Sequence, residues 1–93
     1  MMKDGENVEF ENNRVKVMRV RIGKREKHPA RERKDRVLIW LTDAHETRSE
    51  PNGKKEEIRR KAGDVAWRAA SRHQIENVED KDVELIIVEL KVY

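Results

Sequence analysis

Cationic side chains are concentrated in one segment of the sequence, residues 23–36. This segment, GKREKHPARERKDR, holds seven Lys or Arg against three acidic residues, so it carries a net charge of +4, whereas the whole chain carries +3. Such clusters attract nucleic acid, because each neutralised phosphate releases a condensed counterion. We therefore predict phosphate contacts from this segment and from two arginines that precede it: Arg19, Arg21, Lys24, Arg25, Lys27, Arg31, Arg33, Lys34 and Arg36.

This segment is expected to be a mobile hairpin loop, longer than the usual connection between strands. Binding through it would be electrostatic and weakly sequence-specific, with both DNA and RNA open as ligands. The alternative is an ordinary solvated loop, since Glu26, Glu32 and Asp35 weaken its positive field. No helix-turn-helix, RNA-recognition or zinc-finger pattern accompanies it.

A second candidate site surrounds Trp67. On a helix over residues 54–73, Trp67 would face away from the apolar stripe and lie near Arg60, Gly63 and Ala70. Trp and Arg are enriched at the energetic centres of protein interfaces, so this surface predicts a protein contact. The alternatives are that the N-terminal segment covers Trp67 or that the helix is rotated. Trp40 lies within an apolar run, which favours a core position.

Catalytic signals are weak. Glu89 and Lys91 match half of a metal-dependent nuclease motif, and Asp43 is the available third carboxylate. Asp43, His45 and Glu46 could contribute to a metal site, but turns commonly hold such residues, and His28 and His73 are isolated. We therefore predict a protein that is not an enzyme and has no cofactor and no metal ion.

The elements that would position these residues follow from the hydrophobic periodicity. Strands are expected at 8–11 and 14–22, joined by a turn at Asn12-Asn13, and again at 36–42 and 83–93. Ile58, Ala62, Val65 and Ala69 recur at helical spacing, which predicts an amphipathic helix over 54–73. The expected fold class is α+β: a small mixed sheet of three to four strands with one helix on one face, in the order β-β-β-α-β. The strands at 36–42 and 83–93 would be parallel.

One helix cannot cover both faces of that sheet. In the last strand Val83, Leu85 and Ile87 alternate with Ile86, Val88 and Leu90, so an apolar set remains on each side. We assign Val83, Leu85 and Ile87 to the helix-free face and expect a second copy of the chain, or another protein, to cover it. The alternative is that the N-terminal segment folds across this face.

Composition limits the remaining possibilities. Charged residues make up 44% of the chain and hydrophobic residues 35%, and there is no cysteine, so disulfides and thiolate chemistry are excluded. No apolar run is long enough to span a membrane, and a cytoplasmic location is expected. We expect a flexible N-terminus at 1–7 and one domain at 8–93. The sequence therefore favours a small non-enzymatic nucleic-acid-binding protein; the alternative is a protein-interaction module, such as a phage- or virus-type inhibitor or an assembly subunit.

Overall fold

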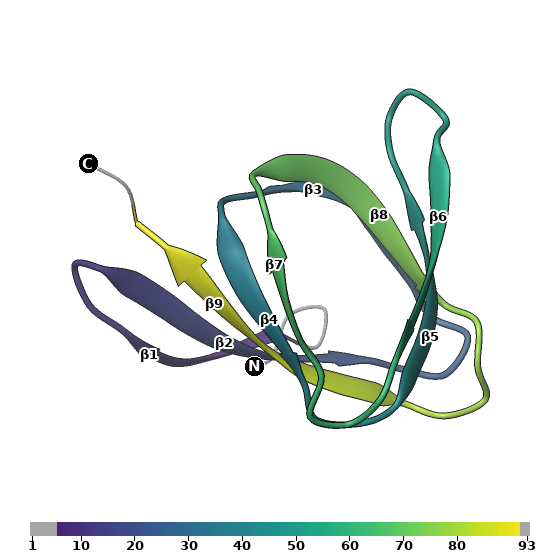
Figure 1. The fold of residues 1–93 in the computed structure, drawn as a ribbon, viewed down its shortest axis with the longest axis horizontal. Helices are drawn as coiled ribbons and strands as arrows, with labels where there is room; N and C mark the ends of the chain where they lie inside the picture. The colour runs from purple at the N-terminus through teal and green to yellow at the C-terminus, as the bar shows by residue number, and fades with distance from the viewer. Residues whose placement is uncertain (1–5, 92–93) are drawn as a thin grey trace.

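The computed structural model describes residues 6–91, which form nine β-strands in two antiparallel sheets (Figure 1). No helix occurs within these residues. The strands are β1 (Glu6–Glu11), β2 (Val15–Ile22), β3 (Lys27–Arg33), β4 (Arg36–Trp40), β5 (Ala44–Ser49), β6 (Lys55–Arg60), β7 (Val65–Arg68), β8 (Ser71–Asn77) and β9 (Val83–Leu90).

The two sheets face each other and form a flattened barrel. The five-stranded sheet has the order β1-β2-β9-β4-β7, and the four-stranded sheet has the order β3-β8-β5-β6. Only the β1–β2 and β5–β6 hairpins stay within one sheet; every other connection carries the chain to the opposite sheet. Every neighbouring pair is antiparallel.

Side chains that point between the sheets form the apolar core. Because strand residues alternate between two faces, every second residue of β2, β4 and β9 points inward. The register aligns these sets, so that Val20 of β2 lies opposite Leu85 of β9. The buried hydrophobic residues are Met18, Val20, Ile22, Leu38, Trp40, Ala44, Ile58, Val83, Leu85 and Ile87.

The predicted α+β fold class is wrong, and the main error is the helix over 54–73. This segment forms β6, β7 and the start of β8. Its alanines and charged residues favour a helix locally, but of the predicted stripe only Ile58 is buried. Gly63 adopts a φ of 92° in the turn after β6, and its N–H donates to the Trp40 carbonyl at 2.7 Å. Cross-strand pairing therefore overrides local helix propensity.

The predicted strand arrangement is also wrong. The strands β4 and β9, expected to be parallel, are antiparallel neighbours, and β9 separates β2 from β4. The basic segment 23–36 is not a long loop: it makes a tight turn and then forms β3 in the opposite sheet. The parallel assignment depended on a helical crossover, which the chain does not contain within 6–91.

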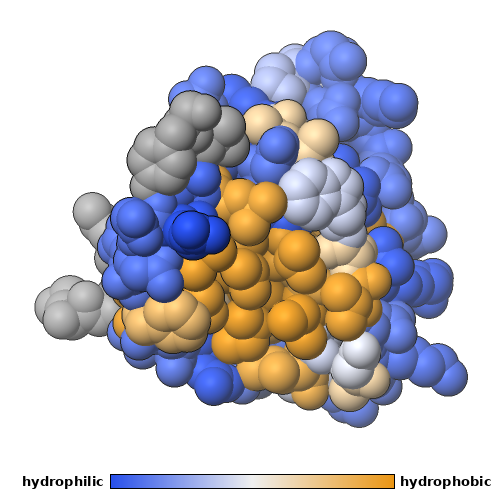
Figure 2. Space-filling view, turned by 60° about the vertical axis from the view of Figure 1, so that its left-hand side comes forward, coloured by the Kyte–Doolittle hydropathy of each residue, from blue (hydrophilic) through white to orange (hydrophobic). Residues whose placement is uncertain are grey.

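The last strand faces the opposite way from the prediction. Val83, Leu85 and Ile87 were assigned to an uncovered face, but they are at most 5% exposed and lie in the core. The alternate residues Ile86 and Val88 are on the outer face instead. The outer surface of the molecule carries a broad hydrophobic area bordered by hydrophilic side chains (Figure 2).

The chain ends fall partly outside the described residues. Of the predicted flexible N-terminus, residues 1–5 lie outside them, whereas Glu6 and Asn7 belong to β1 and pair with Val20 and Arg19 of β2. Residues 92–93 of the predicted last strand also lie outside them. Within 6–91, no helix is long and apolar enough to cross a bilayer.

Candidate functional site

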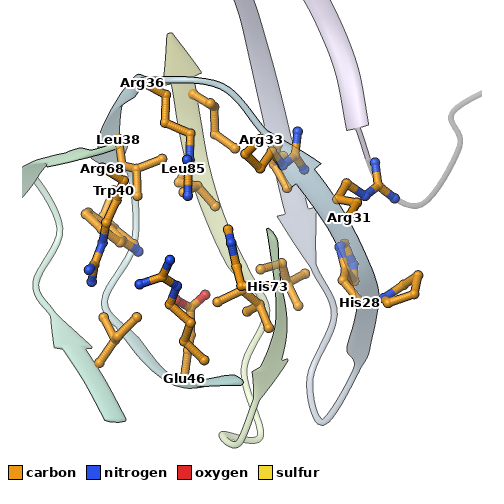
Figure 3. Close-up of a pocket in the computed structure, with 17 residues that line it drawn as sticks. His28, Arg31, Arg33, Arg36, Leu38, Trp40, Glu46, Arg68, His73 and Leu85 are labelled. Atoms are coloured by element: carbon orange, nitrogen blue, oxygen red, sulfur yellow. The ribbon is translucent and has the colours of Figure 1, made fainter. Parts of the chain in front are cut away.

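A cavity of about 70 Å³ lies between the two sheets. Its volume suits a small anion or a few water molecules. Aliphatic side chains of β2, β8 and β9 line one part of it, and arginine and histidine side chains line another (Figure 3). The cavity therefore combines an apolar wall with a strongly cationic one.

Five arginines line this cationic wall. Four of them come from four different strands, and we call these four the arginine cluster; the fifth is Arg31 of β3. Arg33 ends β3, Arg36 begins β4, Arg48 lies in β5 and Arg68 ends β7. All four line the cavity, and their side chains are mostly buried. Arg36 and Arg68 are direct cross-strand partners, an arrangement of like charges that destabilises a sheet unless something compensates it.

Arg36 is the least compensated member of the cluster. It is 2% exposed, and its Nη1 donates to the carbonyls of Lys34 (3.1 Å) and Ala69 (3.2 Å). Within residues 6–91, no carboxylate lies within 4.0 Å of its guanidinium. Burial, and then repulsion from the other three cluster arginines, lower the pKa of Arg36 to about 10, although the charge of Glu89 acts in the opposite direction.

His73 of β8 shares this positive field. Burial, followed by repulsion from all four cluster arginines, lowers the pKa of His73 to about 3. Its imidazole is therefore neutral near pH 7, with Nδ1 lying 3.3 Å from the Ser71 hydroxyl. That hydroxyl in turn accepts a hydrogen bond from Arg48 at 3.0 Å. His73 can thus exchange hydrogen bonds with a ligand without adding to the charge.

Carboxylates at the rim neutralise the cluster only in part. Glu6 of β1 pairs with Arg33, and also with Arg31 at 2.8 Å. Glu56 of β6 lies 3.6 Å from both Arg48 and Arg68. These contacts compensate three members of the cluster, whereas no carboxylate of the described residues forms an ion pair with the Arg36 guanidinium.

Glu46 of β5 is the carboxyl group inside the cavity. It is 3% exposed, and burial raises its pKa to about 7, although the charge of Arg60 acts in the opposite direction. Among residues 6–91, its Oε2 has no hydrogen-bond partner, and neither has Nε1 of Trp40 or Nε of Arg48. Buried polar atoms of folded proteins are nearly always paired, so these three atoms mark a place where a polar ligand can bind.

The predicted nucleic-acid-binding residues do not form one surface. Arg31, Arg33 and Arg36 line the cavity instead of facing solvent. Three others form ion pairs on the outside: Arg19 with Glu9 (3.2 Å), Arg21 with Asp82 (3.4 Å) and Arg25 with Asp80 (2.9 Å). The remaining three, Lys24, Lys27 and Lys34, are exposed.

The predicted interface residues are also dispersed. Trp67 is 54% exposed on the outer face of β7. Arg60 instead stacks on the Trp40 ring, with its Cζ 4.9 Å from the ring centroid. Gly63 and Ala70 lie in the turns before and after β7. The set was defined by helical spacing, which does not apply to strands.

The weaker catalytic candidates are engaged elsewhere. Lys91 pairs with Glu11 at 2.6 Å, and Asp43 accepts a hydrogen bond from the Ala62 amide at 2.9 Å. His45 lies between Glu57 (2.8 Å) and Glu79 (2.9 Å), and both carboxylates raise its pKa. No nuclease-like arrangement therefore forms around Glu89 within the described strands.

Sequence reasoning missed Arg48 and Arg68 and did not assign His73 to a site. The available signal was alternation in β5, where Ala44, Glu46 and Arg48 point inward and the residues between them are half-buried. The segment 43–53 was instead interpreted as a turn, because Asp, Ser, Pro, Asn and Gly occur within its eleven residues.

The fold is similar to those of several solved structures, although no protein-family model and no curated protein matches the sequence. A cupin domain from Bordetella pertussis has a TM-score of 0.87 and 22% identity over 99% of both chains. A protein with a double-stranded β-helix domain from Klebsiella pneumoniae has a TM-score of 0.74 and 16% identity, covering 92% of this chain and 75% of that one. The Schizosaccharomyces pombe Cnp3 cupin domain has a TM-score of 0.73 and 13% identity, covering 94% and 64%. The chain thus has a cupin fold.

These findings correct the predicted function. An α+β nucleic-acid-binding protein with a basic hairpin loop is contradicted, because the fold is that of a cupin and the segment 23–36 is built into its second sheet. The physical reason is that Arg31, Arg33 and Arg36 of β3 and β4 line the cavity, while three of the six predicted cations outside it, Arg19, Arg21 and Arg25, are already paired with carboxylates.

The interior donors of this chain do not fit a metal ion. His28, His73 and Glu46 all line the cavity. Within residues 6–91, however, no three His, Asp or Glu side chains lie close enough to share a metal ion. The arginine cluster would also repel a cation from the same space. This donor set suits an anion.

Proposed function

We propose that the protein binds a small organic anion inside its barrel, with the oxyanion group held by the arginine cluster. The observation that carries this proposal is the buried guanidinium of Arg36, which is 2% exposed among three other arginines and forms no ion pair with a carboxylate of residues 6–91. A buried charge is costly unless it is paired. An anion at this position would supply the missing partner.

Arginine is well suited to such a ligand. Its planar guanidinium binds carboxylate and phosphate groups through two parallel hydrogen bonds. Cluster members approach the cavity from several strands, so they can contact different oxygen atoms of one ligand. The neutral His73 and the Ser71–Arg48 hydrogen bond offer further polar contacts beside them.

The remaining wall limits the rest of the ligand. Leu38, Ile75 and Ile87 line the cavity and would contact a short apolar group. When Glu46 is protonated, its carboxyl group can donate a hydrogen bond to the ligand, because its Oε2 has no partner in the described part of the chain. A short-chain carboxylate satisfies both requirements within a volume of about 70 Å³.

We propose a binding role and not a catalytic one, since every interaction described above can operate without a chemical step. A cytoplasmic location is also part of the proposal, and the absence of cysteine agrees with it.

Calorimetric titration with acetate, butyrate, phosphate and sulfate, at an ionic strength held constant with sodium chloride, tests the proposal. We expect saturable binding of one anion per chain, with butyrate bound more tightly than acetate because of the apolar wall. The thermal unfolding midpoint should rise with the same anions, since a ligand that binds only the folded state stabilises it. The proposal would be contradicted if the test anions gave the same heats and the same unfolding midpoints as sodium chloride at equal ionic strength.

Arg36→Met should lower the affinity at least tenfold, because the variant removes a buried charged hydrogen-bond donor. In anion-free buffer this variant should lose little stability, since relief of repulsion within the arginine cluster offsets the lost hydrogen bonds to the Lys34 and Ala69 carbonyls. Arg72→Met is the matched control, because Arg72 is exposed on β8 next to His73. Equal affinities for the two variants would rule out Arg36 as the anion-binding residue.

A further inference from the structure

A continuous apolar row crosses the outer side of the five-stranded sheet. Strand register places Phe10, Val17, Val88, Val37 and Trp67 side by side across β1, β2, β9, β4 and β7. An aromatic ring thus stands at each edge of the sheet, and β-branched aliphatic residues lie between the two rings.

A second row runs beside the first, with Ile86, Ile39 and Val65 in register on β9, β4 and β7. We call these eight residues the outer apolar face: Phe10, Val17, Val37, Ile39, Val65, Trp67, Ile86 and Val88. Figure 2 shows the broad hydrophobic area on the surface. Val65 is 62% exposed, Phe10 56% and Trp67 54%, so none of the described segments covers this face.

The size of this face suits a protein interface. A covered aromatic side chain buries roughly 150–250 Å², so the two half-exposed rings offer roughly 200 Å², and the aliphatic members raise the total to on the order of 500 Å². A stable dimer buries about 800 Å² on each partner, roughly 65% of it apolar. The face therefore supplies about the apolar area that one side of a dimer needs.

Charges along the border of the face are already neutralised within the chain. Arg19 pairs with Glu9, Arg21 pairs with Asp82 at 3.4 Å, and Lys91 pairs with Glu11 at 2.6 Å. These paired side chains leave little net charge with which to attract a strongly charged partner. A second sheet face of the same apolar and neutral character is complementary to it.

We propose that the outer apolar face binds the same face of a second copy of the chain. The twofold axis would run parallel to the strands, between the five-stranded sheet of one copy and the five-stranded sheet of the other. It would bring β1 of one copy against β7 of its partner. Phe10 of each copy would then meet Trp67 of its partner at both edges of the interface. Such an isologous contact needs only one self-complementary patch. The anion cavity lies on the other side of this sheet and stays accessible.

Light scattering coupled to size-exclusion chromatography tests the proposal. The native chain should be a dimer at micromolar concentration, and Trp67→Glu and Phe10→Glu should each give a monomer. Val8→Glu is the matched control: Val8 is 49% exposed on the same strand, but it pairs with the inward-facing Met18 and therefore lies on the opposite face. This variant should remain a dimer.

Circular dichroism and anion titration would establish that each variant is folded. A monomeric native chain would overturn the proposal and leave the face to a different partner. A folded Trp67→Glu variant that stays dimeric would overturn it as well, as would dissociation of Val8→Glu. Because these readouts concern mass and not ligand affinity, the dimer can fail while the anion site stands, and the reverse also holds.

Discussion

Glu46 is the residue whose ionisation most affects the charge inside the barrel. Burial raises its pKa to about 7, from an ordinary value of 4.5. At pH 7 the carboxyl group is therefore close to half protonated. An ionised Glu46 would partly compensate the arginine cluster, whereas a protonated one leaves the positive field to the ligand. Anion affinity should consequently increase as the pH falls toward 5.

The same shift predicts a pH-dependent stability. A folded-state pKa above the unfolded value means that the folded chain retains a proton which the unfolded chain loses, so Glu46 makes folding less favourable as the pH rises from 4.5 to 7. The cost approaches about 3 kcal/mol above pH 7. Glu46→Gln abolishes this titration. Urea unfolding in anion-free buffer should show the variant gaining stability relative to the native chain across this range.

His73 acts in the opposite direction, because its pKa of about 3 lies below the ordinary value of 6.5. It therefore favours folding increasingly as the pH rises toward 6.5. Both the native chain and Glu46→Gln contain His73. The contribution of His73 therefore cancels when the unfolding free energies of the two proteins are subtracted. If the difference in unfolding free energy between the native chain and Glu46→Gln stayed constant from pH 4.5 to 7, Glu46 would have an ordinary pKa in the folded chain.

Strand β5 explains why the candidate site was difficult to predict from the sequence. A half-buried strand is normally recognised by apolar residues at every second position. In β5 the inward positions after Ala44 are Glu46 and Arg48, so the residues that line the cavity have the polarity expected of a turn. Local rules commonly fail in this way at functional sites, where polar residues are placed inside for binding.

The strands β1, β2, β4 and β9 could be anticipated, because their apolar residues are dense and their boundaries carry turn residues. The Asn12 side chain accepts hydrogen bonds from the amides of Arg14 and Val15, which closes the predicted hairpin. Segment 54–73 was not anticipated, because its local composition favours a helix. Its first strand, β6, pairs with the neighbouring β5 in a hairpin, but the partners of β7 and β8, which are β4, β3 and β5, are distant from them in sequence. Arg33 and Arg36 were selected for their charge, but they were assigned to a solvent-exposed loop, whereas both line the cavity.

His45 connects β5 to two other elements. Its imidazole lies between Glu57 of β6 and Glu79, which follows β8, and its backbone carbonyl accepts a hydrogen bond from the Val78 amide at 3.2 Å. Hydrogen bonds to Glu57 and then to Glu79 raise the pKa of His45 above its ordinary value of 6.5. The protonated ring therefore stabilises this junction below pH 6.5, and the contribution is lost as the pH rises through the raised value.

Hydrogen exchange measured at the Val78 amide tests this junction. Protection should be greater below pH 6.5 than above the raised pKa of His45, after correction for the intrinsic exchange rate. His45→Gln should show equally low protection at both pH values. An unchanged pH dependence in this variant would mean that another group controls the junction.

At the scale of the whole molecule, one sheet provides two independent surfaces. Along β4, Arg36 and Leu38 point into the barrel, while Val37 and Ile39 point to the outer apolar face. Dimerisation should therefore leave the anion affinity unchanged. The Trp67→Glu monomer is expected to bind butyrate as tightly as the native chain does. A large loss of affinity in that variant would show that the two surfaces are coupled.

The proposed function depends most on an anion that occupies the barrel beside Arg36. A crystal structure of the protein grown with selenate, using the anomalous signal of selenium, would test this directly. We predict one strong anomalous peak inside the cavity, within hydrogen-bonding distance of the Arg36 guanidinium and at least one other member of the arginine cluster. Selenate found only at exposed lysines, with ordered water beside Arg36, would contradict the proposed function.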